Sequence, residues 1–231
     1  MYIFPRVPNA RLDQLLQTGF DVTDKTILDY GGSRGNLLED GMERSLIRPE
    51  NYTSMDVDIH GLNHLSNNCP ATTTMLYNRY NPVYNPQGVK NLPFPQADNS
   101  FDTVYSYSVN THSSWQDYLF DISEMLRVSK GAIYTSILDD DCLRFLHRKR
   151  IDEFGTAVDF DVITDTTSGV YFINHSMVMS LGANIPSNIQ YLLTYYKPEW
   201  LISELQSRGM SVKLHEPPSP GIQPLLEIWN N

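Results

Sequence analysis

Apolar and polar residues follow two alternating periods over the first 140 positions of the chain. Short apolar runs that end in glycine or acidic residues predict strands, whereas apolar residues three and four apart predict amphipathic helices. The expected strands are 26–30, 52–58, 101–106 and 131–138. The expected helices are 10–19, 36–42 and 117–128. Strands that alternate with helices at this spacing are typical of βαβ units and a parallel sheet.

The last third of the chain has a different pattern. Pro198 and Gly209 frame an expected helix over 198–208, because proline suits a first helical turn and glycine suits a helix end. Two further strands, 210–215 and 223–230, are joined by a proline-rich turn and predict an antiparallel pair at the sheet edge.

Two stretches lack a clear period. Residues 69–95 contain five prolines and predict a loop with one short strand near Val89. Residues 139–195 predict an irregular insertion. The expected fold is therefore an α/β domain with a mostly parallel sheet, an antiparallel C-terminal edge pair, helices on both faces and one insertion.

Length and charge restrict the partners. The chain has 231 residues, and we expect a single domain over 1–231. Its 27 acidic and 17 basic residues give a net charge of −10, which disfavours nucleic acid and anionic membranes as partners. We find neither an export signal nor an apolar run of membrane-spanning length, and we expect a cytoplasmic protein with reduced Cys69 and Cys142.

The first expected strand runs into a glycine turn, Gly31-Gly32-Ser33-Arg34-Gly35, followed by a helix. In open parallel sheets ligands bind at the carboxyl ends of the strands, and glycines let the backbone approach them closely. The dinucleotide pattern G-x-G-x-x-G fails, because Ser33 and Asn36 occupy its second and third glycine positions. Asp56 ends the second strand, where a carboxylate can accept both hydroxyls of a ribose.

Residues 27–35 resemble the first motif of the class I S-adenosylmethionine-dependent methyltransferases. Residues 91–106, NLPFPQADNSFDTVYS, followed by Val109, His112 and the EMLRV of 124–128, are similar to a run found in the small-molecule branch of that family. Residues 196–200, YKPEW, with the helix and strand after them, resemble the family's penultimate helix and strand. The resemblance covers residues 25–138 and 195–230.

The resemblance implies a Rossmann-like fold, S-adenosylmethionine as cofactor and methyl transfer to a small-molecule acceptor. Residues 139–195 would then form a cap over the substrate cleft. The site residues that it implies are the loop-ordering acid Asp29, the turn glycines Gly31 and Gly35 beneath the methionine part, the ribose acid Asp56, the adenine-side residues Val89 and Lys90, the cofactor-lining Ser106 and the candidate general base His112. Tyr107 and Tyr171 are further candidates for the base.

Two positions depart from the family pattern. Ser33 stands at the middle glycine of the turn, and Gly88 stands where an acid usually precedes the Leu-Pro-Phe run. Recognition of the adenine amino group must therefore come from another residue.

Other features leave alternatives open. His60 and His64, with Asp56 and Asp58, have spacings compatible with a metal cluster, but we interpret the histidines as surface-loop residues and expect no metal site. Asp139–Asp141 is interpreted as a solvated loop with a cation site as the alternative. The basic cluster 144–150 keeps a nucleic-acid or protein methyltransferase open, and the two departures keep a non-catalytic cofactor-binding module open.

Overall fold

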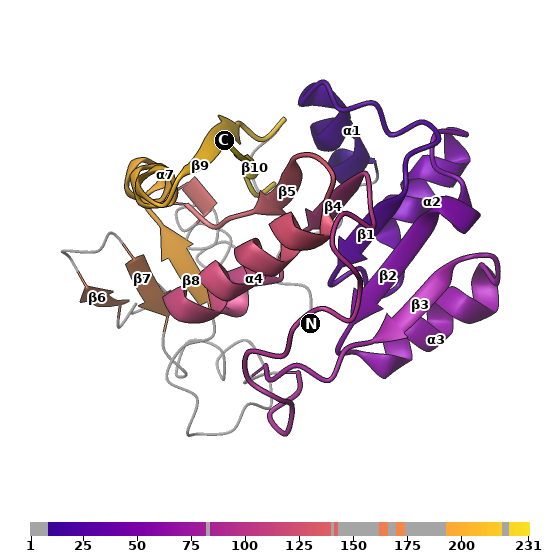
Figure 1. Cartoon of the computed structure of the whole chain (residues 1–231), viewed down its shortest axis with the longest axis horizontal. Helices are drawn as coiled ribbons and strands as arrows, with labels where there is room; N and C mark the ends of the chain where they lie inside the picture. The colour runs from indigo at the N-terminus through magenta and orange to yellow at the C-terminus, as the bar shows by residue number, and fades with distance from the viewer. Residues whose placement is uncertain are drawn as a thin grey trace, which may run out of the picture.

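A seven-stranded sheet with the order β3-β2-β1-β4-β5-β10-β9 forms the centre of the molecule (Figure 1). The structure is a computed structural model that describes residues 9–81, 84–139, 141–142, 162–165, 170–173, 193–218 and 222–231. The strands are β1 (Ile27–Tyr30), β2 (Tyr52–Asp56), β3 (Thr73–Leu76), β4 (Thr103–Ser106), β5 (Ile133–Ser136), β9 (Met210–His215) and β10 (Leu225–Asn230). Strands β1 to β5 are parallel, and β10 pairs antiparallel with both β5 and β9. The expected mostly parallel sheet with an antiparallel C-terminal edge pair is confirmed.

Helices cover both faces of this sheet, as the alternation predicted. The described helices are α1 (Ala10–Gln17), α2 (Asn36–Glu43), α3 (Ile59–Asn68), α4 (Trp115–Val128) and α7 (Pro198–Ser207), with short 3-10 turns η1 (Pro49–Asn51) and η2 (Asn110–His112). Figure 1 shows α4 lying across one face of the sheet, with α2 and α3 towards the opposite end from α7.

The two faces bury different residues of the same strands, because successive strand side chains point to opposite sides. Leu28 and Val104 pack with α4 and α7 in one hydrophobic core. Ile27 and Tyr105, their neighbours along the chain, pack with α1, α2 and α3 in the other. A strand buried on both faces shows a continuous apolar run, which explains why four-residue strands were detectable in the sequence.

Two elements were missed between residues 59 and 95. His60 and His64 lie on α3 and are exposed, so their interpretation as loop residues was wrong. Helix α3 buries only Gly61, Leu62 and Leu65, too few apolar residues for a clear helical period. Strand β3 is an edge strand with exposed or half-buried residues, and the expected strand near Val89 is a single bridge from Val89 to Arg79.

The insertion contains a second, antiparallel sheet, although the sequence predicted irregular structure there. Its strands are β6 (Val162–Asp165), β7 (Val170–Ile173) and β8 (Leu193–Tyr196). Tyr195 at the end of β8 bridges Leu138 after β5, which joins this sheet to the main one. The basic cluster 144–150 and Asp140 lie outside the described residues, and of Tyr171 only the backbone in β7 is described.

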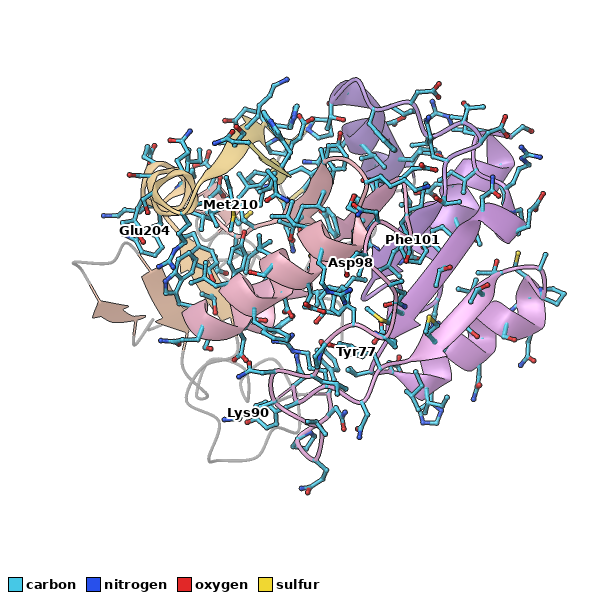
Figure 2. The ribbon with its side chains drawn as sticks, in the orientation of Figure 1. Tyr77, Lys90, Asp98, Phe101, Glu204 and Met210 are labelled. Carbon is cyan, nitrogen blue, oxygen red and sulfur yellow. The ribbon has the colours of Figure 1, made fainter. Side chains whose placement is uncertain are left out.

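The Leu-Pro-Phe run is attached to α4 by charged hydrogen bonds. Glu124 accepts the backbone N–H of Phe94 at 2.7 Å, and Arg127 donates to the Phe94 carbonyl at 3.0 Å and to the Gln96 carbonyl at 2.9 Å. Arg127 also pairs with Asp98, which Figure 2 shows beside α4. The Leu-Pro-Phe run and the EMLRV segment of α4, which both suggested the resemblance, are thus joined by these hydrogen bonds.

Candidate cofactor site

The order of the strands reverses between β1 and β4, because β2 and β3 lie on one side of β1 and β4 and β5 on the other. Ligands of open parallel sheets bind at such a switch point, outside the carboxyl ends of the strands. In the ladder Tyr30 of β1 lies opposite Ser106 of β4 and Met55 of β2. The glycine turn that follows Tyr30 is therefore placed at the switch point.

Glycine is required at the first position of the turn. Gly31 has φ 79°, and a Cβ added there would lie 1.9 Å from Cγ2 of Val109. Its N–H donates to the Met55 carbonyl at 2.7 Å, which holds the turn against β2. Val109 follows β4, so the turn packs directly on the segment that leads to His112. Gly35, also at φ 79°, is the residue before α2.

Asp29 lies under the turn and is 2% exposed. A Cβ on Gly32 would be 2.9 Å from Cγ of Asp29 and 2.6 Å from Oγ of Ser54, so both side chains reach the underside of the turn. Tyr52 donates its hydroxyl hydrogen to Oδ2 of Asp29. Burial raises the pKa of Asp29 to about 6, against the opposing effects of the Tyr52 hydrogen bond and the positive charge of Arg11.

Asp56 joins the end of β2 to the glycine turn. Its carboxylate accepts the backbone N–H of Ser33 at 2.8 Å and that of Asp58 at 2.8 Å. Burial raises the pKa of Asp56, whereas the two N–H donors lower it. Asp58, two residues further on, caps α3 by accepting the N–H of His60 at 3.0 Å and so has a structural role.

Ser106 and Ser54 place buried hydroxyl groups on the two strands that flank β1. Both oxygens lack a hydrogen-bond partner within the described part of the chain. Buried polar groups without partners are uncommon in folded proteins. Together with the glycine turn that a Cβ would fill, these atoms fit a site for the polar methionine part of a nucleoside cofactor.

Exposed apolar side chains gather at the ends of β2 and β3. Leu76 lies opposite Asp56 in the ladder and is 60% exposed, and Ile59 and Val89 are also exposed. An adenine ring needs such apolar contacts on its faces. Lys90 places its ammonium 4.9 Å from the centroid of the Tyr80 ring; Figure 2 shows Lys90 on the loop farther from the sheet than Tyr77.

Close packing of the backbone explains why residue 88 is glycine instead of the acid that the resembled family usually has there. A Cβ at this position would lie 2.3 Å from the carbonyl oxygen of Arg79, because residues 78–80 and 88–89 run against each other. Val89 donates to the Asn78 carbonyl at 2.9 Å, and Tyr80 donates to the Val89 carbonyl at 3.0 Å. No acidic side chain fits at residue 88 in this arrangement.

A buried ion pair anchors the same loop and was not detectable in the sequence. Arg79 pairs with Asp121 of α4, and Tyr30 donates its hydroxyl to the second oxygen of Asp121 at 3.3 Å. The side chains of Arg79 and Asp121 are 5% and 1% exposed. Arg79 lies in a loop with no periodic pattern, so only its contacts reveal the pairing.

His112 closes η2 at the carboxyl end of β4 and is 8% exposed. Its ring meets the ring of Tyr84 edge-on, with the centroids 5.7 Å apart. Asn110 and Thr111 beside it are buried, and Asn110 donates to Oγ1 of Thr135 at 3.2 Å. The structure therefore brings the candidate base to the same edge as Gly31, Asp56 and Ser106.

The structure also bears on the possible metal ligands, the two cysteines and membrane-spanning segments. Within the described residues no group of three histidine, cysteine or acidic side chains could hold a metal ion. Cys69 and Cys142 are free and buried. None of the described helices is long and apolar enough to cross a membrane.

Solved structures share this fold. No protein-family model and no curated protein matches the chain. A magnesium protoporphyrin IX methyltransferase from Synechocystis with bound S-adenosylhomocysteine aligns over 95% of this chain and 80% of its own, with TM-score 0.53 and 12% identity. The 1,6-didemethyltoxoflavin-N1-methyltransferase of Burkholderia thailandensis, also with S-adenosylhomocysteine, covers 96% of this chain and 77% of its own, with TM-score 0.55 and 11% identity.

A third structure carries a different description. A Rhodobacter sphaeroides protein described as a zinc-dependent alcohol dehydrogenase covers 100% of this chain and 93% of its own, with TM-score 0.63 and 15% identity. At these identities the likenesses show the fold alone, which is a Rossmann-like α/β fold that the two methyltransferases share.

Proposed function

We propose that the protein transfers a methyl group from S-adenosylmethionine to a small-molecule acceptor. The observation that carries the proposal is the position of Asp56: its carboxylate ends β2 beside the switch point and is hydrogen-bonded to Ser33 of the glycine turn. An acid at this place suits the hydroxyls of a ribose, and the exposed Ile59, Leu76 and Val89 suit the adjoining base.

The chain's own residues would bind and align the two reactants. When bound, S-adenosylmethionine supplies a methyl group that its sulfonium already activates. Gly31, Gly35 and Asp29 would hold its methionine part, Asp56 its ribose and Ser106 the edge next to β4. The remaining contribution is to orient the acceptor atom and exclude water.

His112 is our candidate for a general base. It follows the segment packed on Gly31 and is almost buried, so it stands near the reactive end of a cofactor in the turn. An imidazole titrates close to neutral pH and can remove a proton from an acceptor. Replacing His112 by alanine should lower kcat by at least tenfold with unchanged cofactor affinity if it acts in this way.

The small-molecule class also rests on indirect support. The magnesium protoporphyrin and toxoflavin enzymes with this fold act on small molecules, and the net charge of −10 disfavours a polyanionic acceptor. We further propose that residues 1–231 form one domain in which 139–195 cap the acceptor side.

Calorimetry with S-adenosylhomocysteine tests the cofactor, and methyl transfer to an extract of small metabolites tests the reaction. We expect micromolar binding that Asp56→Ala weakens at least tenfold, and labelled small products identified by mass. The exposed Asp24, which pairs with Arg48, supplies the control variant Asp24→Ala. Absence of binding, or binding unaffected by Asp56→Ala, contradicts the cofactor proposal; binding without turnover favours a non-catalytic module.

A further inference from the structure

Asp29 is a buried carboxylate whose partners are incompletely supplied by the protein. Of its two oxygens, only Oδ2 has a hydrogen-bond donor among the described residues, and that donor is the Tyr52 hydroxyl. No described Lys, Arg or His lies within ion-pair distance of it. An ionised carboxylate can accept about four hydrogen bonds and is costly to bury without a positive partner.

Tyr52 reaches Asp29 from the neighbouring strand. It opens β2 and is completely buried, and its ring lies on the same face of the sheet as Asp29, two positions along the ladder. Burial and the nearby carboxylate raise the pKa of Tyr52, so its phenol keeps the proton that it donates. The Tyr52 ring packs in the core beneath α1, α2 and α3, and its hydroxyl fixes the direction in which Asp29 points.

The remaining groups around Asp29 do not replace this donor. Tyr105 of β4 lies beside Asp29 in the ladder, but its hydroxyl has no hydrogen-bond partner among the described residues. Arg11 of α1 lies over the Tyr107 ring, 4.5 Å from its centroid, and acts on Asp29 only by its charge. Asp56 adds a negative charge from β2, and Asp40 of α2 lies near Tyr105.

We infer that Tyr52 is a positioning residue that holds Asp29 ready to receive the ammonium group of the cofactor's methionine part. The inference rests on the proposed function. Asp29 lies directly beneath Gly32, so an ammonium bound against the turn would bring a positive charge close to this carboxylate. The Tyr52 hydrogen bond favours the ionised carboxylate, which is the form that attracts an ammonium.

Binding of two different ligands distinguishes a positioning role of Tyr52 from a general contribution to the stability of the fold. S-adenosylhomocysteine carries the ammonium, whereas 5′-methylthioadenosine keeps the nucleoside and sulfur and lacks the amino-acid part. We expect Tyr52→Phe to weaken S-adenosylhomocysteine binding at pH 7 roughly tenfold and to leave methylthioadenosine binding unchanged. Tyr134→Phe is the matched control, because Tyr134 is a buried strand tyrosine that donates to Glu227 at 3.3 Å, away from Asp29.

The pH dependence of ligand affinity distinguishes the two roles, because a residue that only packs in the core would not shift it. In the wild type the affinity for S-adenosylhomocysteine should fall as the pH drops below about 6, where Asp29 takes up a proton. Loss of the Tyr52 donor raises the pKa of Asp29, so in Tyr52→Phe this fall should begin at a higher pH. The pH profile of methylthioadenosine binding should be the same in the wild type and in Tyr52→Phe, because any effect of Asp56 on the ribose is common to both proteins. Equal losses for both ligands, no loss, or an unmoved profile overturn the inference.

Asp29→Asn keeps the inference testable if Tyr52→Phe does not fold. This variant retains the side-chain volume and should abolish the preference for S-adenosylhomocysteine over methylthioadenosine together with its pH dependence. A retained preference overturns the inference while the proposed function stands. A wild-type protein that binds neither ligand overturns the proposed function itself.

Discussion

The backbone N–H of Ser33 donates to the carboxylate of Asp56 at 2.8 Å, which connects the glycine turn after β1 to the end of β2. Ser33 adopts φ 44°, a left-handed conformation at the position where the resembled family has glycine. Its hydroxyl packs on Gly61 of α3, where a Cβ would lie 2.3 Å from Oγ. Asp56, the glycine turn and α3 therefore depend on one another.

Gly61→Ala should weaken cofactor binding although Gly61 has no place in the proposed cofactor contacts. The added methyl group displaces Ser33 and with it the N–H that orients Asp56, and we expect a roughly tenfold loss of S-adenosylhomocysteine affinity by calorimetry. Stability should be affected less, because alanine is favoured over glycine in a helix by about 1 kcal/mol. Adding Ser33→Gly removes the hydroxyl, which is the nearest contact, and should restore part of the affinity, because Asp58 Oδ2 at 3.0 Å and the backbone carbon of residue 33 at 3.1 Å remain close. A double variant with no recovery at all would contradict a link through the Ser33 side chain.

Gly31→Ala should destabilise the fold through Val109. A methyl group 1.9 Å from Cγ2 of Val109 must displace it, and the positive φ adds strain of about 1–2 kcal/mol. We expect a total loss of about 2–4 kcal/mol in the free energy of unfolding, measured by urea denaturation. Combining Gly31→Ala with Val109→Ala should recover the share of the lost unfolding free energy that the clash with Val109 causes. Equal stability of the single and double variants contradicts direct packing between these two residues.

Glu124→Gln should loosen the joint between α4 and the Leu-Pro-Phe run. The variant weakens the acceptor of the Phe94 N–H and breaks the ion pair with Arg127, with an expected loss of about 1–3 kcal/mol. Hydrogen exchange should speed up at Phe94 and stay unchanged at the β1 amides. Glu204→Gln on α7, whose nearest charged partner Arg208 is 3.8 Å away at the surface, is the control. Unchanged protection of Phe94 would contradict the role assigned to Glu124.

Asp121 should make stability fall as the pH rises from about 4 to 7. Burial raises the pKa of Asp121 to about 7 despite the opposing charge of Arg79, so the folded protein binds more protons than the unfolded chain in this window. The difference in the free energy of unfolding between the wild type and Asp121→Asn should become less favourable to the wild type from pH 5 to pH 7. Above pH 8 this difference should no longer change with pH. Urea denaturation at several pH values checks this, and a constant difference between the two proteins contradicts it.

The elements predictable from sequence are those whose residues carry a strong local signal. Strand β1 is a short buried run, apolar except for Asp29, that leads into glycines, and α4 has apolar residues at helical spacing, so both were placed within two residues. Strand β3 and helix α3 expose most of their side chains, and their structure depends on pairing with β2 and packing of Leu65, which a local pattern does not reveal.

The candidate site shows the same division. Gly31, Gly35 and Asp56 stand at recognisable places after predicted strands, and the structure brings them to one edge of the sheet. Tyr52, Gly61 and Arg79 were missed because each acts through a partner distant in the sequence: Asp29, Ser33 and Asp121 respectively. Sequence spacing carries no information on such pairs.

The contact between Gly31 and Val109 has a mechanical consequence. The segment that ends at His112 begins at Val109, and Val109 occupies the space above Gly31. One valine side chain therefore packs on the glycine turn while its backbone begins the segment that leads to His112. A substitution that moves Val109 is expected to disturb both the turn and the position of His112.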